Sequence, residues 1–167
     1  QVIQGINDSE NFGFSVRVIV SGCWGFASSS TFSEKEVTRV AAVACEMALA
    51  NKKIQKTRIE LVPTPVYNET WNTPIRKSAF DVSIDDKVSL LFKINEKAKS
   101  LGADFCSSFI WAVNEYKYFI SSEGSYIKQD LHRLNSGFEV TIVDKATGEF
   151  DSREGFTAPI GMGYEYV

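Results

Sequence analysis

A strand–turn–strand pattern in residues 13–28 constrains the fold of this chain more than any other stretch. One phenylalanine and three valines occupy every second position from residue 14 to residue 20, which predicts a strand with one well-buried face. Ser21 and Gly22 follow as a hairpin turn, because glycine tolerates the positive φ that such turns require. The return strand carries Trp24 and Phe26 on one face, while small residues keep the other face thin. We therefore expect a β-hairpin against which another element packs closely.

The residues after this hairpin predict an amphipathic helix that ends near Asn51. Ser33 and Glu36 have the spacing of a capping box, in which the side chain of each accepts the backbone N–H of the other. Two acidic residues in the first turn also suit the positive end of the helix dipole. The apolar residues that recur at three–four spacing on one face are Val37, Val40, Ala41, Ala44, Met47 and Ala48. The alanines allow this helix to approach a sheet closely.

A short strand and a long connection are expected next. Residues 57–62 alternate as a strand, which Pro63 and Pro65 end. The connection in residues 63–83 is long for a compact domain, and such loops are usually functional or drape over the core. Trp71 within it is interpreted either as an aromatic cover over the core or as a contact for a partner.

A second helix and a meander of strands complete the expected fold. Asp85 and Asp86 begin the helix, and Gly102 is its expected C-terminal cap. Strands are predicted at residues 105–113, 116–121, 126–133 and 138–143, with short turns at 114–115, 123–124 and 136–137. Because such turns force antiparallel neighbours, the expected class is α+β, with a largely antiparallel or mixed sheet and two main helices packed on one face.

The size and charge of the chain limit its class. A chain of 167 residues fits one domain, so residues 1–167 are expected to form a single domain. The net charge of -3, with scattered Lys and Arg, disfavours nucleic acid as a partner, and no apolar run predicts a membrane span. Widely spaced Cys23, Cys45 and Cys106 are interpreted as buried free thiols. Free thiols favour the cytoplasm and leave open an exported form whose leader has been removed.

No catalytic constellation emerges from the residues themselves. His132 is the single histidine, which excludes an HExxH zinc site within these residues. On a predicted strand it is interpreted as a surface or hydrogen-bonded residue. The sequence holds no nucleophile elbow, phosphate-binding loop or dinucleotide fingerprint, and residues 144–148 are a turn that lacks alternating calcium ligands. We therefore predict no catalytic, cofactor-binding or metal residue in this chain.

An ordered set of motifs nevertheless resembles a known family. The first block consists of Gly13, Val16, Arg17, Gly22, Trp24, Gly25, Phe26, Ala27 and Ser28. Later matches are Trp71, Asn72, Thr73 and Pro74, then Phe80, Asp81 and Lys87, then residues 121–125 with Gly124, and finally Gly163, Tyr164 and Glu165. Together they resemble the N-terminal domain of the TldD/PmbA family, bacterial and archaeal metallopeptidases once called modulators of DNA gyrase. The last motif is more similar to the TldD branch than to the TldE branch.

The resemblance implies that the chain is part of a longer zinc metallopeptidase. Family members carry a helix and a strand before this region and a large C-terminal domain after it. In the TldD branch, that second domain holds an HExxxH zinc motif with a further cysteine ligand, so zinc is expected there and no cofactor in these residues. The N-terminal domain is expected to help form a dimer, with itself or with a TldE/PmbA-like partner, and to wall a chamber where unfolded peptides are cut.

Two other interpretations stay open at this point. The same residues suit a non-enzymatic binding module, as in a metal-free TldE/PmbA-like partner subunit, because no zinc ligand is expected here in either case. Binding to DNA or gyrase has only the old family name in its favour, and the acidic balance opposes it. If a preceding strand pairs beside residues 14–20, its absence would leave an exposed sheet edge that favours self-association.

Overall fold

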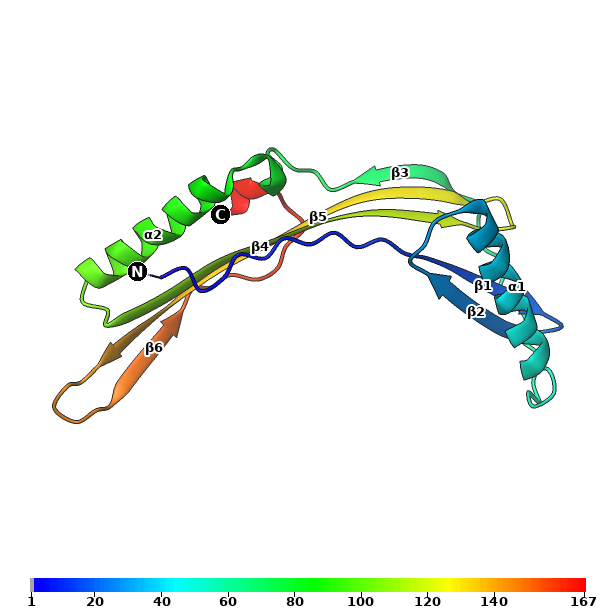
Figure 1. Cartoon of the computed structure of the whole chain (residues 1–167), viewed down its shortest axis with the longest axis horizontal. Helices are drawn as coiled ribbons and strands as arrows, with labels where there is room; N and C mark the ends of the chain where they lie inside the picture. Colours follow the sequence, from blue (N-terminus) through cyan, green and yellow to red (C-terminus); the bar gives the residue numbers. More distant parts are fainter. Residues whose placement is uncertain (1) are drawn as a thin grey trace. The chain divides into compact units, whose positions relative to one another are not determined.

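The computed structural model describes residues 2–167, which divide into two compact units. One unit is Ile3–Thr64, and the other is Pro65–Val167 together with Val2. The first unit contains β1 (Phe14–Val20), β2 (Cys23–Ser29) and α1 (Glu34–Asn51). The second contains β3 (Asn68–Asn72), α2 (Ile84–Ser100), β4 (Phe105–Ile120), β5 (Tyr126–Val143) and β6 (Phe150–Glu154), with short 3-10 helices η1 (Ala79–Asp81) and η2 (Tyr164–Tyr166) (Figure 1). The expectation of a single domain over 1–167 stays a prediction.

The first unit is a β-hairpin with one helix packed on it. β1 and β2 pair antiparallel from Phe14 opposite Ser29 to Val20 opposite Cys23. Ser21 and Gly22 both have positive φ, at 54° and 76°, which is the backbone of a tight two-residue turn that matches strand twist. The predicted hairpin is therefore confirmed.

α1 packs against the thin face of that hairpin, as predicted. Val40, Ala44 and Ala48 are fully buried against it. A Cβ atom on Gly25 would overlap the carbonyl oxygen of Ala44, so this position requires glycine for the helix to approach. The apolar core of this unit therefore depends on small residues on both sides of the contact.

Of the capping box predicted for α1, only the hydrogen bond to the Ser33 side chain forms. The Ser33 hydroxyl accepts the Glu36 N–H at 3.2 Å, which satisfies one free donor of the first turn. The Glu36 carboxylate does not complete a capping box. It accepts instead from Arg39, with Oε1 2.6 Å from Nη2 and Oε2 2.8 Å from Nε. These hydrogen bonds, with a smaller contribution from Ser29, lower the pKa of Glu36 to about 2.

The strand predicted at residues 57–62 is wrong, because these residues have no strand conformation. The Ile59 N–H donates to the Gly22 carbonyl at 2.9 Å, and the Gln55 side chain donates to the same oxygen at 3.2 Å. A strand needs a neighbouring strand over several residues. The hairpin turn offers this segment a single carbonyl, so residues 57–62 form no strand despite their alternating pattern.

The second unit is a mixed sheet built around the long strand β5. One edge of β5 pairs antiparallel with β4 from Phe105 opposite Thr141 to Ile120 opposite Tyr126. Short segments share the other edge: β3 pairs in parallel with residues 126–130, and β6 pairs antiparallel with residues 139–143. Between them Leu134 exchanges two 2.9 Å backbone hydrogen bonds with Ile160, and its side chain is fully buried. Leu134 is thus part of the buried core of this unit, as are Ala79 and Val82.

Two of the turns predicted in the meander are wrong, because β4 and β5 each continue without interruption. Asn114 lies opposite His132, and Gly137 lies opposite Phe109. The Asn114 amide nitrogen is 3.2 Å from His132 Nε2, and a Cβ on Gly137 would lie 3.0 Å from the Phe109 ring. Both residues therefore serve cross-strand contacts instead of turning the chain. The turn predicted at 123–124 is confirmed, with Gly124 at φ 105°.

α2 confirms the second predicted helix and packs on β4. The Ser83 hydroxyl caps it by accepting the Asp86 N–H at 3.0 Å, and Gly102 follows its end with φ 103°. The Asn95 side chain donates to the Ser108 hydroxyl of β4 at 3.3 Å. The predicted α+β class with a largely antiparallel, mixed arrangement is confirmed, and the strands form two sheets that carry one helix each.

Part of the connection predicted as a loop is ordered secondary structure. It contains β3 and η1, and Trp71 lies within β3 opposite Gln129 of β5. The Trp71 side chain is 49% exposed, so it does not close over the core. A partner contact at this residue stays a prediction.

Candidate functional site

The motif residues of the sequence fall into separate groups in the structure. Those of the first unit are Gly13 before β1, Val16 and Arg17 in β1, Gly22 in the turn, and Trp24, Gly25, Phe26, Ala27 and Ser28 in β2. Those of the second unit are Gly124 in the β4–β5 turn, and Gly163, Tyr164 and Glu165 around η2. Each group defines a distinct structural feature.

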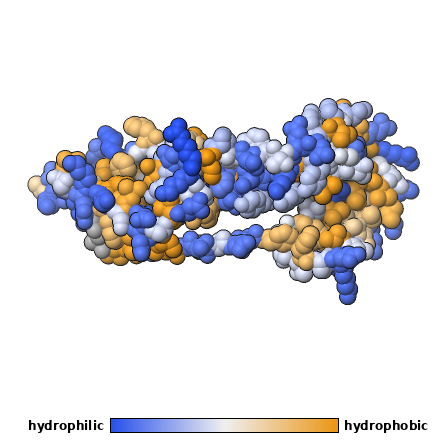
Figure 2. All heavy atoms as spheres, turned by 90° about the horizontal axis from the view of Figure 1, so that it is seen from above, coloured by the Kyte–Doolittle hydropathy of each residue, from blue (hydrophilic) through white to orange (hydrophobic). Residues whose placement is uncertain are grey.

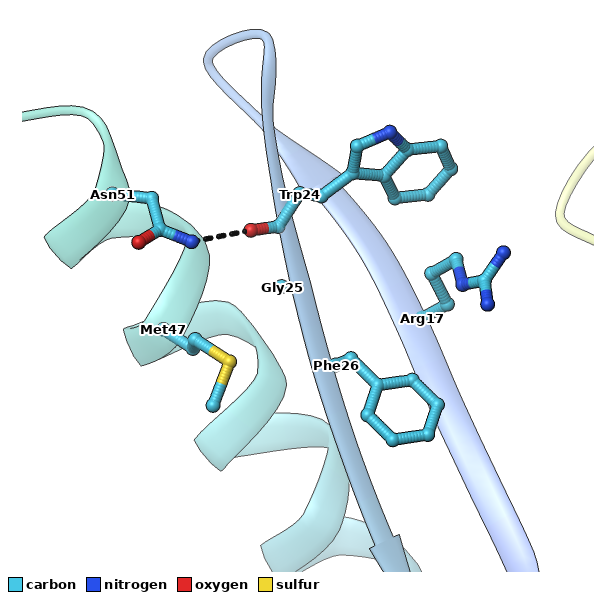
Figure 3. A pocket seen from close by; sticks show the side chains of 6 residues that line it. All are labelled: Arg17, Trp24, Gly25, Phe26, Met47 and Asn51. Carbon is cyan, nitrogen blue, oxygen red and sulfur yellow. Dashed lines mark hydrogen bonds between the residues drawn. The ribbon is translucent and has the colours of Figure 1, made fainter. Parts of the chain in front are cut away.

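A groove lies beside β2 in the first unit. It has a volume of about 370 Å³ and is lined by Arg17, Trp24, Gly25, Phe26, Met47 and Asn51 (Figure 3). Phe26 and Met47 are each 44% exposed, so apolar surface is open to solvent at this position. We refer to these six residues as the β2 groove.

Arg17 lies over the aromatic side of the groove. Its guanidinium carbon is 5.6 Å from the centre of the Trp24 ring and 5.9 Å from the centre of the Phe26 ring. These three side chains share the hairpin face opposite Gly25, because residues alternate between faces along each strand. Cation–π attraction holds the guanidinium there, and no carboxylate in residues 2–167 forms an ion pair with it.

The groove also includes the free edge of β2. In a hairpin with a two-residue turn, the pair Val20–Cys23 is hydrogen-bonded, so the backbone groups of Trp24, Phe26 and Ser28 point away from β1. The Trp24 carbonyl accepts from Asn51 Nδ2 at 2.9 Å, which joins the end of α1 to this edge. Beyond that bond, the strand edge is open along Phe26 and Ser28.

The tail motif of the second unit forms a backbone clamp. The Glu165 carboxylate accepts the N–H groups of Arg76 and Lys77, each at 3.0 Å, and that of Gly163 at 3.2 Å. These bonds, with that of Arg76 the strongest, lower the pKa of Glu165 to about 2. The Tyr164 N–H donates to the Lys77 carbonyl at 2.7 Å. Glycine is required at 163, because a Cβ there would overlap that same carbonyl oxygen.

His132 lies in a polar cluster on β4 and β5. Its Nε2 is 3.2 Å from Asn114 Nδ2 and 3.3 Å from Asp130 Oδ1, and the side chain is 12% exposed. Its interpretation as a hydrogen-bonded strand residue is confirmed. In the described part of the chain, no three His, Cys, Asp or Glu side chains come together as a possible metal site.

Comparison with known proteins agrees with the motifs. A family model described as PmbA/TldA metallopeptidase domain 1 matches residues 1–48, which include the hairpin and most of α1. The chain is 25% identical over 136 residues to metalloprotease MJ0996 of Methanocaldococcus jannaschii. That alignment covers 78% of this chain and 29% of the relative, so the chain spans less than a third of the relative's length.

These matches show that the chain is similar to a domain of a metallopeptidase family. More particularly, they support an N-terminal domain of the TldD/PmbA family, and the resemblance seen in the sequence is confirmed. Separately, none of the helices within residues 2–167 combines the length and apolarity that crossing a membrane needs.

The sequence analysis did not identify several residues of the β2 groove and of the Glu165 clamp. Asn51 was expected only as the end of a helix, and Met47 only as part of its apolar face. Nothing local marks Arg76 and Lys77 as partners of Glu165, because they contribute backbone N–H groups from about ninety residues away in the chain. The one local sign of this contact in the sequence is the acidic residue Glu165 within a glycine-rich tail.

Proposed function

We propose that this chain is the N-terminal, non-catalytic domain of a TldD-like zinc metallopeptidase that degrades or matures unfolded peptides. The match of residues 1–48 to domain 1 of this metallopeptidase family carries the proposal. In this proposal the domain contributes to dimerisation and to the wall of the substrate chamber, and the zinc ligands belong to another domain of the longer protein.

Exposed aromatic surface supports a role in assembly. The β4 face opposite α2 presents Phe105, Phe109 and Trp111, which are 65%, 48% and 49% exposed. Figure 2, seen from above, shows further apolar surface, in orange, on the α2 side of this unit, whereas the β4 face opposite α2 lies on the far side of that view. Large apolar patches on soluble proteins mark interaction sites. This strip of β4 is therefore our candidate for the contact with a second subunit or with the next domain.

Cleavage by the full-length protein tests the catalytic part of the proposal. Purified full-length protein is incubated with an unfolded peptide, with and without a zinc chelator, and cleavage is followed by mass spectrometry. The proposal expects cleavage that the chelator abolishes and added zinc restores. Cleavage that is equal with and without chelator contradicts a metallopeptidase. Absence of both zinc and cleavage would favour the binding-module alternative, a TldE/PmbA-like partner subunit.

Sedimentation of β4 variants tests the assembly part. Phe109→Ser, made in the full-length protein, should weaken the dimer by at least about tenfold if this face is buried at the interface. Glu149→Gln, on the loop before β6, serves as the control and should leave the dimer unchanged. An unchanged dimer in Phe105→Ser and Phe109→Ser alike would remove this face from the proposed interface.

A further inference from the structure

We propose that the β2 groove binds an extended, acidic peptide segment, which adds to the free edge of β2 as a third strand. The inference rests on the proposed function only in naming an unfolded peptide as the ligand. Binding at this groove needs no zinc centre, so it is measurable with a chelator present, and its failure is distinguishable from a failure of catalysis.

The backbone of β2 supplies the first part of the site. The N–H and C=O groups of Phe26 and Ser28 face away from β1, and in residues 2–167 no backbone group bonds to them from that side. An unpaired strand edge is a template for another strand, because main-chain hydrogen bonds are independent of the added sequence. The edge begins beyond the Trp24 carbonyl, which Asn51 occupies.

The cavity supplies the second part of the site. Trp24 and Phe26 lie on one side of it and Met47 lies on the other (Figure 3), while Gly25 presents bare backbone. A volume of about 370 Å³ accommodates one large apolar side chain of an added strand. Met47 suits such a wall, because its flexible thioether adapts to differently shaped side chains.

The charge of Arg17 supplies the third part and sets the class of ligand. The guanidinium is held over Trp24 and Phe26, and no carboxylate in the described part of the chain pairs with it. A Glu or Asp on the added strand would complete this pairing. The favoured segment therefore has an acidic side chain on the face that Arg17 shares with Trp24 and Phe26, and an apolar side chain at the adjacent position, on the face toward Met47.

A labelled peptide tests the site directly. The probe is a fluorescein-labelled extended peptide with phenylalanine and glutamate at adjacent positions in a threonine background. We expect saturable binding to the full-length protein, measured by fluorescence anisotropy with chelator present. N-methylation of the probe's backbone on the edge that would face β2 should reduce binding by at least about tenfold, because it removes the inter-strand donors.

Charge reversal tests the role of Arg17. Arg17→Glu should reduce the affinity for the glutamate probe by roughly tenfold and should increase the affinity for a matched lysine probe. Lys35→Glu, at the opposite end of α1, makes the same change in net charge and should alter neither. The gain for the lysine probe cannot result from misfolding, so it separates recognition from loss of structure.

The outcomes that overturn the proposal are specific. Absence of saturable binding of the glutamate probe would remove the site. Equal binding of the N-methylated probe would exclude strand addition. Equal effects of Arg17→Glu and Lys35→Glu, or unchanged binding in Met47→Trp, which fills the cavity, would place any binding elsewhere on the protein.

Discussion

The carboxylate of Glu165 accepts the backbone N–H of Lys77 at 3.0 Å, and with Arg76 and Gly163 it satisfies three backbone donors through one side chain. The tail of the chain is thereby fixed to the segment that follows β3. A resemblance that singled out Gly163, Tyr164 and Glu165 thus corresponds to a defined clamp within the second unit.

This clamp predicts an acid-dependent stability. The pKa of Glu165 is lowered from 4.5 to about 2, so the carboxylate stabilises the fold fully above about pH 4.5, and this contribution is lost as the pH falls toward 2. Glu165→Gln should melt at a lower temperature than wild type at neutral pH. The difference should shrink between pH 4.5 and 2, as measured by circular dichroism.

A surface carboxylate provides the control for this experiment. Glu96→Gln, on the exposed side of α2, should not change the melting temperature at either pH. A Glu165→Gln difference that stays constant down to pH 2 would show that the carboxylate charge does not hold the clamp.

Because α1 packs closely on the hairpin, adding one methyl group at Gly25 should greatly reduce the stability of the protein. Gly25→Ala should destabilise the protein by about 3 kcal/mol or more, because its Cβ would overlap the Ala44 carbonyl and the helix must move away. Gly5→Ala, where a Cβ meets nothing within 4 Å, should stay within about 0.5 kcal/mol of wild type in urea unfolding. Equal stabilities of the two variants would contradict the packing described here.

The burial of Leu134 predicts that this side chain contributes strongly to the stability of the second unit. It is fully buried where β5 meets Ile160, so Leu134→Ala should cost about 2–5 kcal/mol in urea unfolding. Leu61→Ala makes the same change at a side chain that is 56% exposed and should cost less than about 1 kcal/mol. A small loss for Leu134→Ala would mean that the core lies elsewhere.

The open edge of β1 predicts self-association. Backbone groups of Ile19 and Arg17 face this edge, beside which the sequence analysis expects a preceding strand in the longer protein. The chain alone should therefore associate more readily than the full-length protein, and Ile19→Lys should reduce association. Light scattering that finds a monodisperse wild-type monomer at high concentration would contradict this expectation.

The sequence predicted the elements whose signals are local. The turn at Ser21 and Gly22, the Ser33 cap of α1 and the glycine after α2 all depend on a few neighbouring residues. Gly25 was recognised as a site of close packing for the same reason. The alternation in residues 14–20 was enough to place the hairpin face that receives α1.

The rest depends on partners that are distant in the chain. Asn114 and Gly137 indicate turns locally, but they make cross-strand contacts once β4 and β5 pair over their whole length. β3 is a strand because residues 126–130 of β5 offer it an edge, and Glu165 finds its partners about ninety residues away in the chain. Local propensity cannot report such pairings.

Zinc analysis tests the central claim most directly. Elemental analysis is carried out on the full-length protein and on residues 1–167 prepared alone, after both are dialysed against the same zinc-containing buffer and washed. We predict bound zinc in the full-length protein and none in residues 1–167. Stoichiometric zinc on residues 1–167, or none on the full-length protein, would contradict a non-catalytic N-terminal domain of a zinc metallopeptidase.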